Sequence, residues 1–199
     1  MAKLLLATNN LGKVRELQAL LAGEAFELTT PSQQGLSLDV EESGKTLEEN
    51  AAKKAIAFSK ASGLPALADD SGLFIDHLDG APGVHSARYA GPEASDTDRL
   101  ALVMERLDGV PTGERTACFR AVIAVATPDK ALLYAHGECC GIISTVPSGK
   151  NGFGYDPIFV FPEYQKTMAE LDSTLKNALS HRGRAIEAAL PALRLLFSK

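Results

Sequence analysis

The chain is poor in the residues and patterns on which several classes of protein depend. It has three cysteines, Cys118, Cys139 and Cys140, without Cys-x-x-Cys spacing. Their odd number predicts reduced thiols rather than a disulfide framework. The four histidines form no cluster in the sequence, so a zinc site is not expected. Neither a Gly-x-Ser-x-Gly nor a Walker A segment occurs, which argues against covalent catalysis through serine and against that type of phosphate loop.

Basic charge and long apolar runs are also scarce. The formal net charge is -5, whereas non-specific binding to nucleic acid needs a clustered basic face. The apolar run within residues 1–10 is too short for a signal peptide or a membrane span. We therefore expect a cytoplasmic protein that has neither a nucleic-acid partner nor a membrane partner.

What the sequence does contain suits a globular fold. Hydrophobic residues make up 45% of the 199 positions and charged residues 23%, which are ordinary values for a soluble domain. A chain of this length can bury a core without covalent staples. No repeat, low-complexity segment or linker stands out, so we expect a single domain over residues 1–199, in which any two lobes share one sheet.

Alternating strand and helix patterns indicate an α/β protein with a mixed sheet. In the first half, strands are predicted at 3–7 and 25–29, and helices from Lys13 onward and from a Thr46–Glu49 capping box to about Ser62. In the second half, the patterns predict a helix capped by Asp96, a hairpin of strands 116–127 and 131–143, a strand at 158–161, and a helical region 173–197 that is broken near 180–183.

Two adjacent carboxylates, Asp69 and Asp70, interrupt the apolar stretch Leu67–Asp76 (LADDSGLFID). Because Asp, Ser and Gly form turns, a turn between strands accounts for the backbone here. The alternative is a metal or acid/base site. Neighbouring acids on an extended chain point in opposite directions, so we expect Asp70 to face metal and water and leave the role of Asp69 open.

Two further segments of the first half contain groups that suit phosphate chemistry. The loop Thr8–Lys13 (TNNLGK) lies between a predicted strand and a helix N-terminus, where backbone N–H groups favour an anion. The alternative is a polar capping loop with a solvated Lys13. Glu41 and Glu42 precede the second helix, where they suit Mg2+ together with an aspartate; Lys53 faces the same site or is an exposed lysine.

In the second half, polar and aromatic groups occur at two glycine-rich breaks. Phe153 in GFGYDP suits stacking on a base, although such aromatics also enter cores. Lys176, His181 and Arg182 are donors suited to carbonyl and phosphate oxygens, or else form the basic end of a helix. Arg120 lies in an apolar strand and predicts a structural ion pair with an acid such as those near Asp70.

Taken in order, these segments resemble one family, the inosine triphosphate pyrophosphatases, also described as XTP/dITP diphosphatases. The resemblance spans the chain and rests on ATNNLGKVREL, EESGKTLEENAAKKA, PALADDSGL, GAPGVHSARYAG, GFGYDPIF and SHRGRA. It implies Mg2+-dependent hydrolysis of ITP, dITP and XTP to the monophosphate and pyrophosphate. It also implies a homodimer with an elongated two-lobed α/β fold around a long mixed sheet, with a cleft between the lobes.

The resemblance assigns roles to individual residues. Asp70 matches the general base and a Mg2+ contact, and Glu41 a second metal position. Substrate contacts match Thr8, Asn9, Asn10, Leu11, Gly12, Lys13, Ser71, Phe153, Gly154, Tyr155, Asp156, Lys176, His181 and Arg182. The sequence departs from many relatives at Asn9, where they have Gly, and just before Lys176, where they have acids.

Two other functions remain open at this point. The first is a hydrolase for other nucleotides, such as the pyrimidine-directed relatives that share the fold. The second is a catalytically silent nucleotide-binding module, against which the acid pair and Lys13 argue. Donors facing the 6-oxo group of hypoxanthine or xanthine would discriminate against adenine, whereas the exclusion of guanine does not follow from the sequence.

Overall fold

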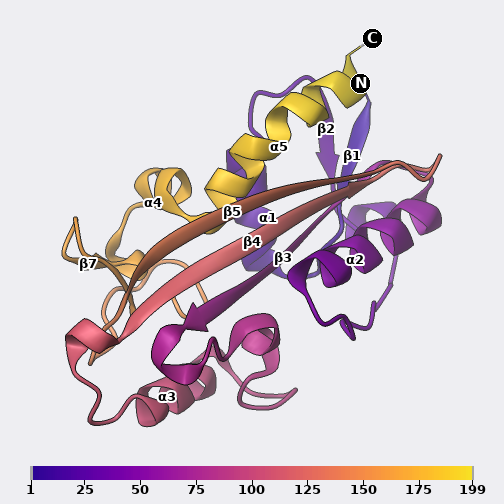
Figure 1. Ribbon diagram of the computed structural model, residues 1–199. Helices are drawn as coiled ribbons and strands as arrows, with labels where there is room; N and C mark the ends of the chain where they lie inside the picture. Colours follow the sequence, from indigo (N-terminus) through magenta and orange to yellow (C-terminus); the bar gives the residue numbers. More distant parts are fainter. Residues whose placement is uncertain (1, 199) are drawn as a thin grey trace. The chain divides into compact units, whose positions relative to one another are not determined.

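A computed structural model describes residues 2–198, and its strands form one seven-stranded sheet (Figure 1). The strand order is β2-β1-β3-β4-β5-β6-β7. β1 pairs in parallel with β2 and β3, whereas β5 with β6 and β6 with β7 are antiparallel. The predicted α/β class with a mixed sheet is therefore confirmed.

The elements follow the predicted order. The strands are β1 (Lys3–Leu6), β2 (Glu27–Thr29), β3 (Ala66–Ile75), β4 (Thr116–Ala126), β5 (Leu132–Ile143), β6 (Phe159–Phe161) and β7 (Lys166–Thr167). The α-helices are α1 (Leu11–Leu20), α2 (Leu47–Ser62), α3 (Asp96–Arg106), α4 (Ser173–Leu179) and α5 (His181–Phe197). The break predicted near 180–183 separates α4 from α5, and the two-residue β7 was not predicted.

The prediction of a turn at Asp69 and Asp70 was wrong. β3 runs unbroken through both residues, and both side chains are buried. Turn-forming residues tolerate an extended backbone where tertiary contacts demand it, and here each carboxylate meets a cationic partner that offsets the cost of its burial. The strand interior thus carries the acids that the sequence pattern assigned to a loop.

The start of α3 also differs from the prediction. Ser95, not Asp96, is the N-cap, and it forms a reciprocal capping box with Asp98. The Ser95 hydroxyl accepts the Asp98 N–H at 3.2 Å, and the Asp98 carboxylate accepts the Ser95 N–H at 2.8 Å. The carboxylate of Asp96 is left available for another contact.

The chain divides into two compact units. Unit 1 contains the segment that ends at Asp70, the segment Ala121–Gly137 and the segment that begins at His181. Unit 2 contains Ser71–Arg120 and Glu138–Ser180. The boundaries fall within β3, β4 and β5, so each of these strands contributes residues to both units.

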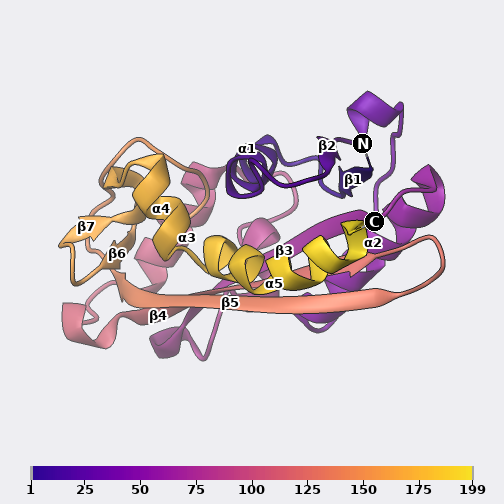
Figure 2. The same cartoon turned by 90° about the horizontal axis from the view of Figure 1, so that it is seen from above.

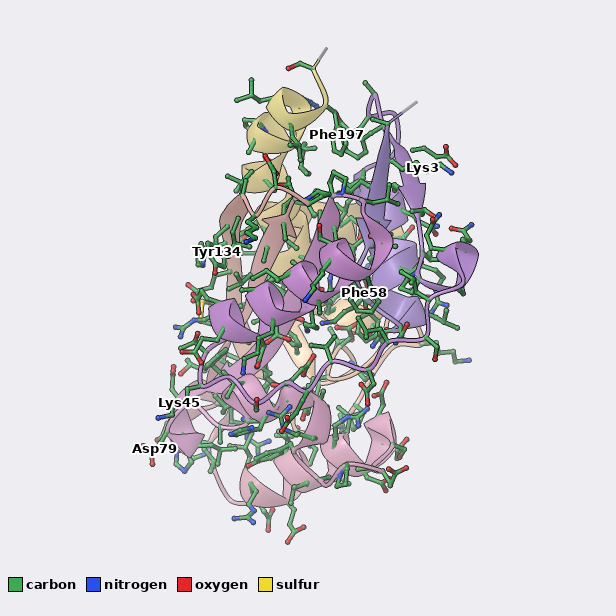
Figure 3. All side chains as sticks on the ribbon, turned by 90° about the vertical axis from the view of Figure 1, so that its right-hand side faces the viewer. Lys3, Lys45, Phe58, Asp79, Tyr134 and Phe197 are labelled. Atoms are coloured by element: carbon green, nitrogen blue, oxygen red, sulfur yellow. A yellow bond between two sulfur atoms is a disulfide. The ribbon has the colours of Figure 1, made fainter. Side chains whose placement is uncertain are left out.

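In unit 1, α1 and α5 bury apolar residues against the strands. Leu17 of α1 and Ile186 of α5 join one core cluster with Leu67 and Ile123 of the sheet. Figure 2 shows α5 lying along β5. The ring of Phe197, which lies near the end of α5 and is labelled in Figure 3, packs against Phe26 with ring centroids 4.6 Å apart. These contacts hold α5 in unit 1, and two predicted site residues lie at the start of this helix.

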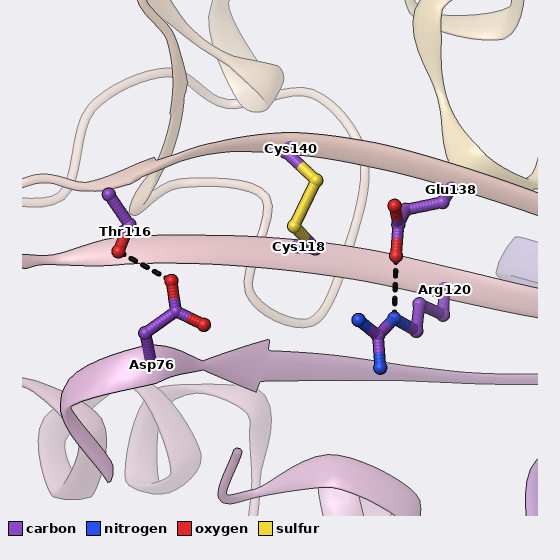
Figure 4. The surroundings of a disulfide bond; sticks show 6 residues. All are labelled: Asp76, Thr116, Cys118, Arg120, Glu138 and Cys140. Atoms are coloured by element: carbon purple, nitrogen blue, oxygen red, sulfur yellow. Dashed lines mark hydrogen bonds and ion pairs between the residues drawn. A yellow bond between two sulfur atoms is a disulfide. The ribbon is translucent and has the colours of Figure 1, made fainter. Parts of the chain in front are cut away.

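In unit 2, one face of the sheet is covered and the other carries exposed polar groups. The covered face joins Phe119 and Phe159 of the strands to Leu107, which follows α3. On the other face, Arg120 donates to Glu138 at 2.6 Å, and both side chains are half exposed (Figure 4). The prediction that Arg120 pairs with an acid near Asp70 was wrong. Its partner is Glu138 of the neighbouring strand β5.

The prediction of reduced thiols was also wrong for two of the three cysteines. Cys118 and Cys140 form a disulfide between β4 and β5, with their Cα atoms 4.0 Å apart (Figure 4). Cys139 is not part of a disulfide and is buried, since alternation along β5 turns it to the opposite face from Cys140. An odd number of cysteines therefore did not exclude a disulfide, because two of them pair across the strands and the third lies in the core.

Candidate active site

The predicted site residues fall into two groups, one in each unit. Unit 1 holds Thr8, Asn9, Asn10, Leu11, Gly12, Lys13, Glu41, Asp70, His181 and Arg182; unit 2 holds Ser71, Phe153, Gly154, Tyr155, Asp156 and Lys176. Ser71 is partly buried, Glu41 is exposed, and His181 is buried at the start of α5.

In unit 1, a single ammonium group joins two carboxylates. The Nζ of Lys54 donates to Oδ1 of Asp70 at 2.6 Å and to Oε1 of Glu42 at 2.7 Å. It also lies 3.3 Å from the carbonyl oxygen of Asp69. We call Asp70, Lys54 and Glu42 the acid–lysine cluster. It brings carboxylate oxygens from β3 and from the loop before α2 to one point.

Lys54 was missed by the sequence prediction, which considered Lys53 instead. Lys53 is exposed and donates to the hydroxyl of Ser43 at 3.0 Å. The signal for Lys54 was its spacing, because it follows Leu47 by seven positions and Ala51 by three, on the buried stripe of α2. A lysine on the apolar face of a helix needs a buried anionic partner, and β3 supplies one.

The loop before α2 is fixed by Asn50. Its Oδ1 accepts the Gly44 N–H at 2.8 Å, and a Cβ at position 44 would lie only 2.6 Å from that oxygen. The Nδ2 of Asn50 is buried without a hydrogen-bond partner among the described residues. This close approach of the Gly44 backbone to α2 positions the loop that carries Glu41 and Glu42.

Burial and charge set the protonation of the cluster. Burial raises the pKa of Asp70, and Lys54 and Lys13 only partly offset this effect. Burial lowers the pKa of Lys54, but the carboxylates of Asp70 and Glu42 outweigh it, so the pKa of Lys54 lies above its ordinary value. The lysine stays charged, and Asp70 is a stronger proton acceptor than an exposed aspartate.

Asp69 points to a different set of partners, as predicted for neighbouring residues on a strand. Its Oδ2 accepts from Nε of Arg182 at 2.6 Å and lies 3.5 Å from Nζ of Lys13. Arg182 also donates to Glu16 at 2.5 Å. Burial raises the pKa of Asp69, but Arg182 and Lys13 outweigh it and hold this pKa well below its usual range. Asp69 is thus a buried anion in a structural ion-pair network.

The loop Thr8–Lys13 caps α1 with its own side chains. Oδ1 of Asn10 accepts the N–H groups of Gly12 and Lys13 at 2.8 and 3.1 Å, and Asn9 donates to the Leu38 carbonyl at 3.3 Å. The alternative of a solvated Lys13 was wrong, since its ammonium donates to the carbonyl of Asp69 at 3.0 Å and burial lowers its pKa. The polar capping loop, which was part of the same alternative, is confirmed for the backbone of this segment.

In unit 2, Asp156 and Lys176 form a buried ion pair. Nζ of Lys176 lies 2.6 Å from Oδ2 of Asp156, which also accepts the Phe153 N–H at 2.8 Å. The same ammonium lies 5.2 Å from the centroid of the Phe153 ring. Gly152 has φ 76°, and a Cβ there would lie 1.9 Å from the Asp156 carboxylate. Tyr155 enters the core, whereas Phe153 stays partly exposed.

Comparison with known proteins identifies the family of this chain. The model of the Ham1 family matches residues 4–192. The chain belongs to the Ham1 family. A relative from Desulforamulus reducens, named dITP/XTP pyrophosphatase, is 48% identical over 195 residues, covering 98% of this chain and 97% of its own. One of the same name from Escherichia coli O157:H7 is 46% identical over 98% of this chain and 99% of its own.

Solved structures of Ham1 proteins have the same fold. A HAM1 protein from Coxiella burnetii has a TM-score of 0.87 at 46% identity, covering 97% of this chain and 98% of its own. The Ham1 protein of Staphylococcus aureus has a TM-score of 0.85 at 37% identity, over 98% and 99%. The family resemblance found in the sequence is confirmed. Across the described part of this Ham1 chain, no helix has both the length and the apolar character to cross a membrane.

Proposed function

We propose that this Ham1 family chain hydrolyses ITP, dITP and XTP to the monophosphate and pyrophosphate, and so removes deaminated purines from the nucleotide pool. The observation that carries the proposal is the acid–lysine cluster, in which Lys54 holds the carboxylate of Asp70 at 2.6 Å. The relatives named dITP/XTP pyrophosphatase support the substrate class.

Cleavage of a phosphoanhydride needs charge neutralisation, an in-line water and a group that orients it, with little covalent work for the protein. Asp70 would accept the proton of the attacking water, since burial raises its pKa. Lys54 would hold this carboxylate in place, and Lys13 would add positive charge near the phosphates.

The donor set also fits a divalent cation. Asp70 and Glu42 converge on the Lys54 ammonium, and carboxylate oxygens are the ligands that Mg2+ takes together with water and substrate phosphates. Asp70, with Glu41 or Glu42, would hold the ion. When bound, it would neutralise charge on the phosphate oxygens.

In unit 2, the base and sugar would be recognised by Phe153–Asp156 with Lys176. For His181 and Arg182 of unit 1, the proposal of nucleotide contacts comes from the family resemblance alone. Lys176 carries three N–H donors, of which Asp156 accepts one. A donor facing the 6-oxo group rejects adenine, because the mismatch leaves a polar group unpaired. A pocket that crowds the 2-amino group would exclude guanine. A homodimer and a cytoplasmic location are proposed from the family resemblance alone.

The test is an incubation of the purified protein with Mg2+ and ITP, dITP, XTP, dTTP, GTP or ATP, with pyrophosphate and orthophosphate measured separately. We expect pyrophosphate from the first three and little from the others, with loss of turnover after treatment with EDTA. Orthophosphate alone would contradict the cleavage position. Preferential turnover of dTTP would favour a pyrimidine-directed hydrolase, and binding without turnover would favour a silent module.

A further inference from the structure

Asp96 begins α3, yet the helix does not need its carboxylate as a cap. Ser95 and Asp98 already supply the reciprocal hydrogen bonds of the capping box. Asp96 instead accepts the backbone N–H of Gly154 with its Oδ2, at 2.7 Å and across 58 positions of sequence. Both residues belong to unit 2. The contact therefore ties the glycine-rich loop to α3.

The carboxylate of Asp96 is itself held in place. Its Oδ1 accepts from the guanidinium of Arg99, one turn further along α3. Arg99 also donates to the carbonyl of Ala87 at 3.0 Å. Because both oxygens of Asp96 are engaged, the group is oriented before any ligand arrives, and its bond to Gly154 is charge-assisted.

Side chains of the loop hold the residues on either side of Gly154. Asp156 accepts the Phe153 N–H, and the hydroxyl of Tyr155 donates to the Ser86 carbonyl at 2.9 Å. Gly154 has no side chain and adopts φ 61°, a conformation open to glycine. Its N–H donates to Asp96, and this bond fixes the backbone at Gly154.

We propose that Asp96 is a positioning residue for base recognition: by fixing the Gly154 backbone, it sets the ring of the adjacent Phe153 against the Lys176 ammonium. This inference rests on the proposed function, in which Phe153–Asp156 and Lys176 recognise the purine. Asp96 acts through Gly154 and touches no substrate.

The kinetic test compares Asp96→Ala with Asp98→Ala, which removes an acid from the same turn of α3 but keeps the Gly154 contact. For Asp96→Ala, we expect the KM for XTP to rise about tenfold, the loss typical of a charged hydrogen bond, with a smaller change in kcat. The ratio of kcat/KM for XTP to that for GTP should fall. Asp96→Asn keeps an oxygen acceptor. It should bring both the KM for XTP and the XTP to GTP ratio of kcat/KM most of the way back to the wild-type values.

For Asp98→Ala, the urea midpoint should fall while the XTP to GTP ratio stays at the wild-type value. Equal changes of this ratio in Asp96→Ala and Asp98→Ala would overturn the proposal, because Asp96 would then act only through the stability of the helix.

Hydrogen–deuterium exchange gives a second readout that needs no turnover. The peptide containing Gly154 should exchange faster in Asp96→Ala than in the wild type or Asp98→Ala. Unchanged exchange would overturn the inference. A wild-type enzyme that releases no pyrophosphate from any nucleotide would instead contradict the proposed function, and with it the role in base recognition.

Discussion

Lys54 and Asp70 are joined by a buried ion pair, with Nζ and Oδ1 2.6 Å apart, and the same ammonium lies 2.7 Å from a carboxylate oxygen of Glu42. Within the acid–lysine cluster itself, one positive charge faces two negative ones. A divalent cation bound there, as proposed above, would reduce this excess of negative charge.

Replacing Lys54 by Met should lower kcat/KM for XTP by about ten- to a hundredfold, because a partner that orients a functional carboxylate contributes on that scale. Lys53→Met is the matched control, since Lys53 is the neighbouring lysine and its exposed side chain donates to the Ser43 hydroxyl. Steady-state kinetics on both variants would measure the difference. Equal losses in the two variants would contradict the special role of Lys54.

Asp70→Asn should nearly abolish turnover, because an amide cannot accept the proton of the attacking water. The fold should survive, since the amide oxygen can still accept from Lys54 at the position of Oδ1. Circular dichroism would check the fold, and pyrophosphate release would check the activity. Near-normal turnover in the variant would move the general base to another residue.

Asp69→Asn should destabilise the protein by about 3 kcal/mol, because it weakens a buried ion pair and leaves the Arg182 guanidinium undercompensated. Glu138→Gln is the control, since it removes a half-exposed pair with Arg120 and should cost less than about 1 kcal/mol. Urea unfolding gives both values. Similar costs for the two variants would show that Asp69 is not a structural anion.

The difference in stability between the wild type and Asp69→Asn should change with pH in a definite direction. The folded pKa of Asp69 is depressed, so its contribution to stability is complete above its unfolded pKa of about 3.9 and is lost as the pH falls through the folded value. The stability gap between wild type and Asp69→Asn should therefore be constant above about pH 5 and shrink below about pH 4. A gap that widens in acid would contradict the ion-pair assignment.

Much of the fold was predictable because it depends on local patterns. The hairpin of β4 and β5, the Thr46 cap of α2 and the break before His181 each follow from periodicity or turn chemistry within a short window. The continuous strand β3 was not predictable in this way. Its acids are stabilised by Arg182 of α5, 113 positions from Asp69, and by Lys54 of α2, 16 positions from Asp70, and no pattern within the strand itself reveals these partners.

The candidate site shows the same division. The opposite directions of Asp69 and Asp70 follow from strand geometry alone. The choice between Lys53 and Lys54 needed the phase of α2 relative to its buried stripe, which the sequence does contain. The contact of Asp96 with Gly154, by contrast, joins positions 58 residues apart, and only the folded chain brings them together.

Reduction of the disulfide between Cys118 and Cys140 should lower stability, because the bond closes a loop with a sequence separation of 22. Chain entropy sets the scale of the loss at about 3 kcal/mol. Urea unfolding with and without dithiothreitol would measure it. The stability of the double variant Cys118→Ser, Cys140→Ser should not change with dithiothreitol. A change in its stability would assign the effect to Cys139 instead.

Gly137 of β5 lies so close to the start of α5 that no side chain fits between them. A Cβ on Gly137 would lie 2.1 Å from the carbonyl oxygen of His181 and 2.3 Å from the backbone N of Ala185. Both neighbours are backbone, so relief would require α5 to move, and Gly137→Ala should cost about 3 kcal/mol or more. Gly113→Ala, where nothing lies within 4 Å, should change stability by less than about 0.5 kcal/mol. Equal stability of the two variants in urea unfolding would show that this close contact between β5 and α5 does not position His181 and Arg182.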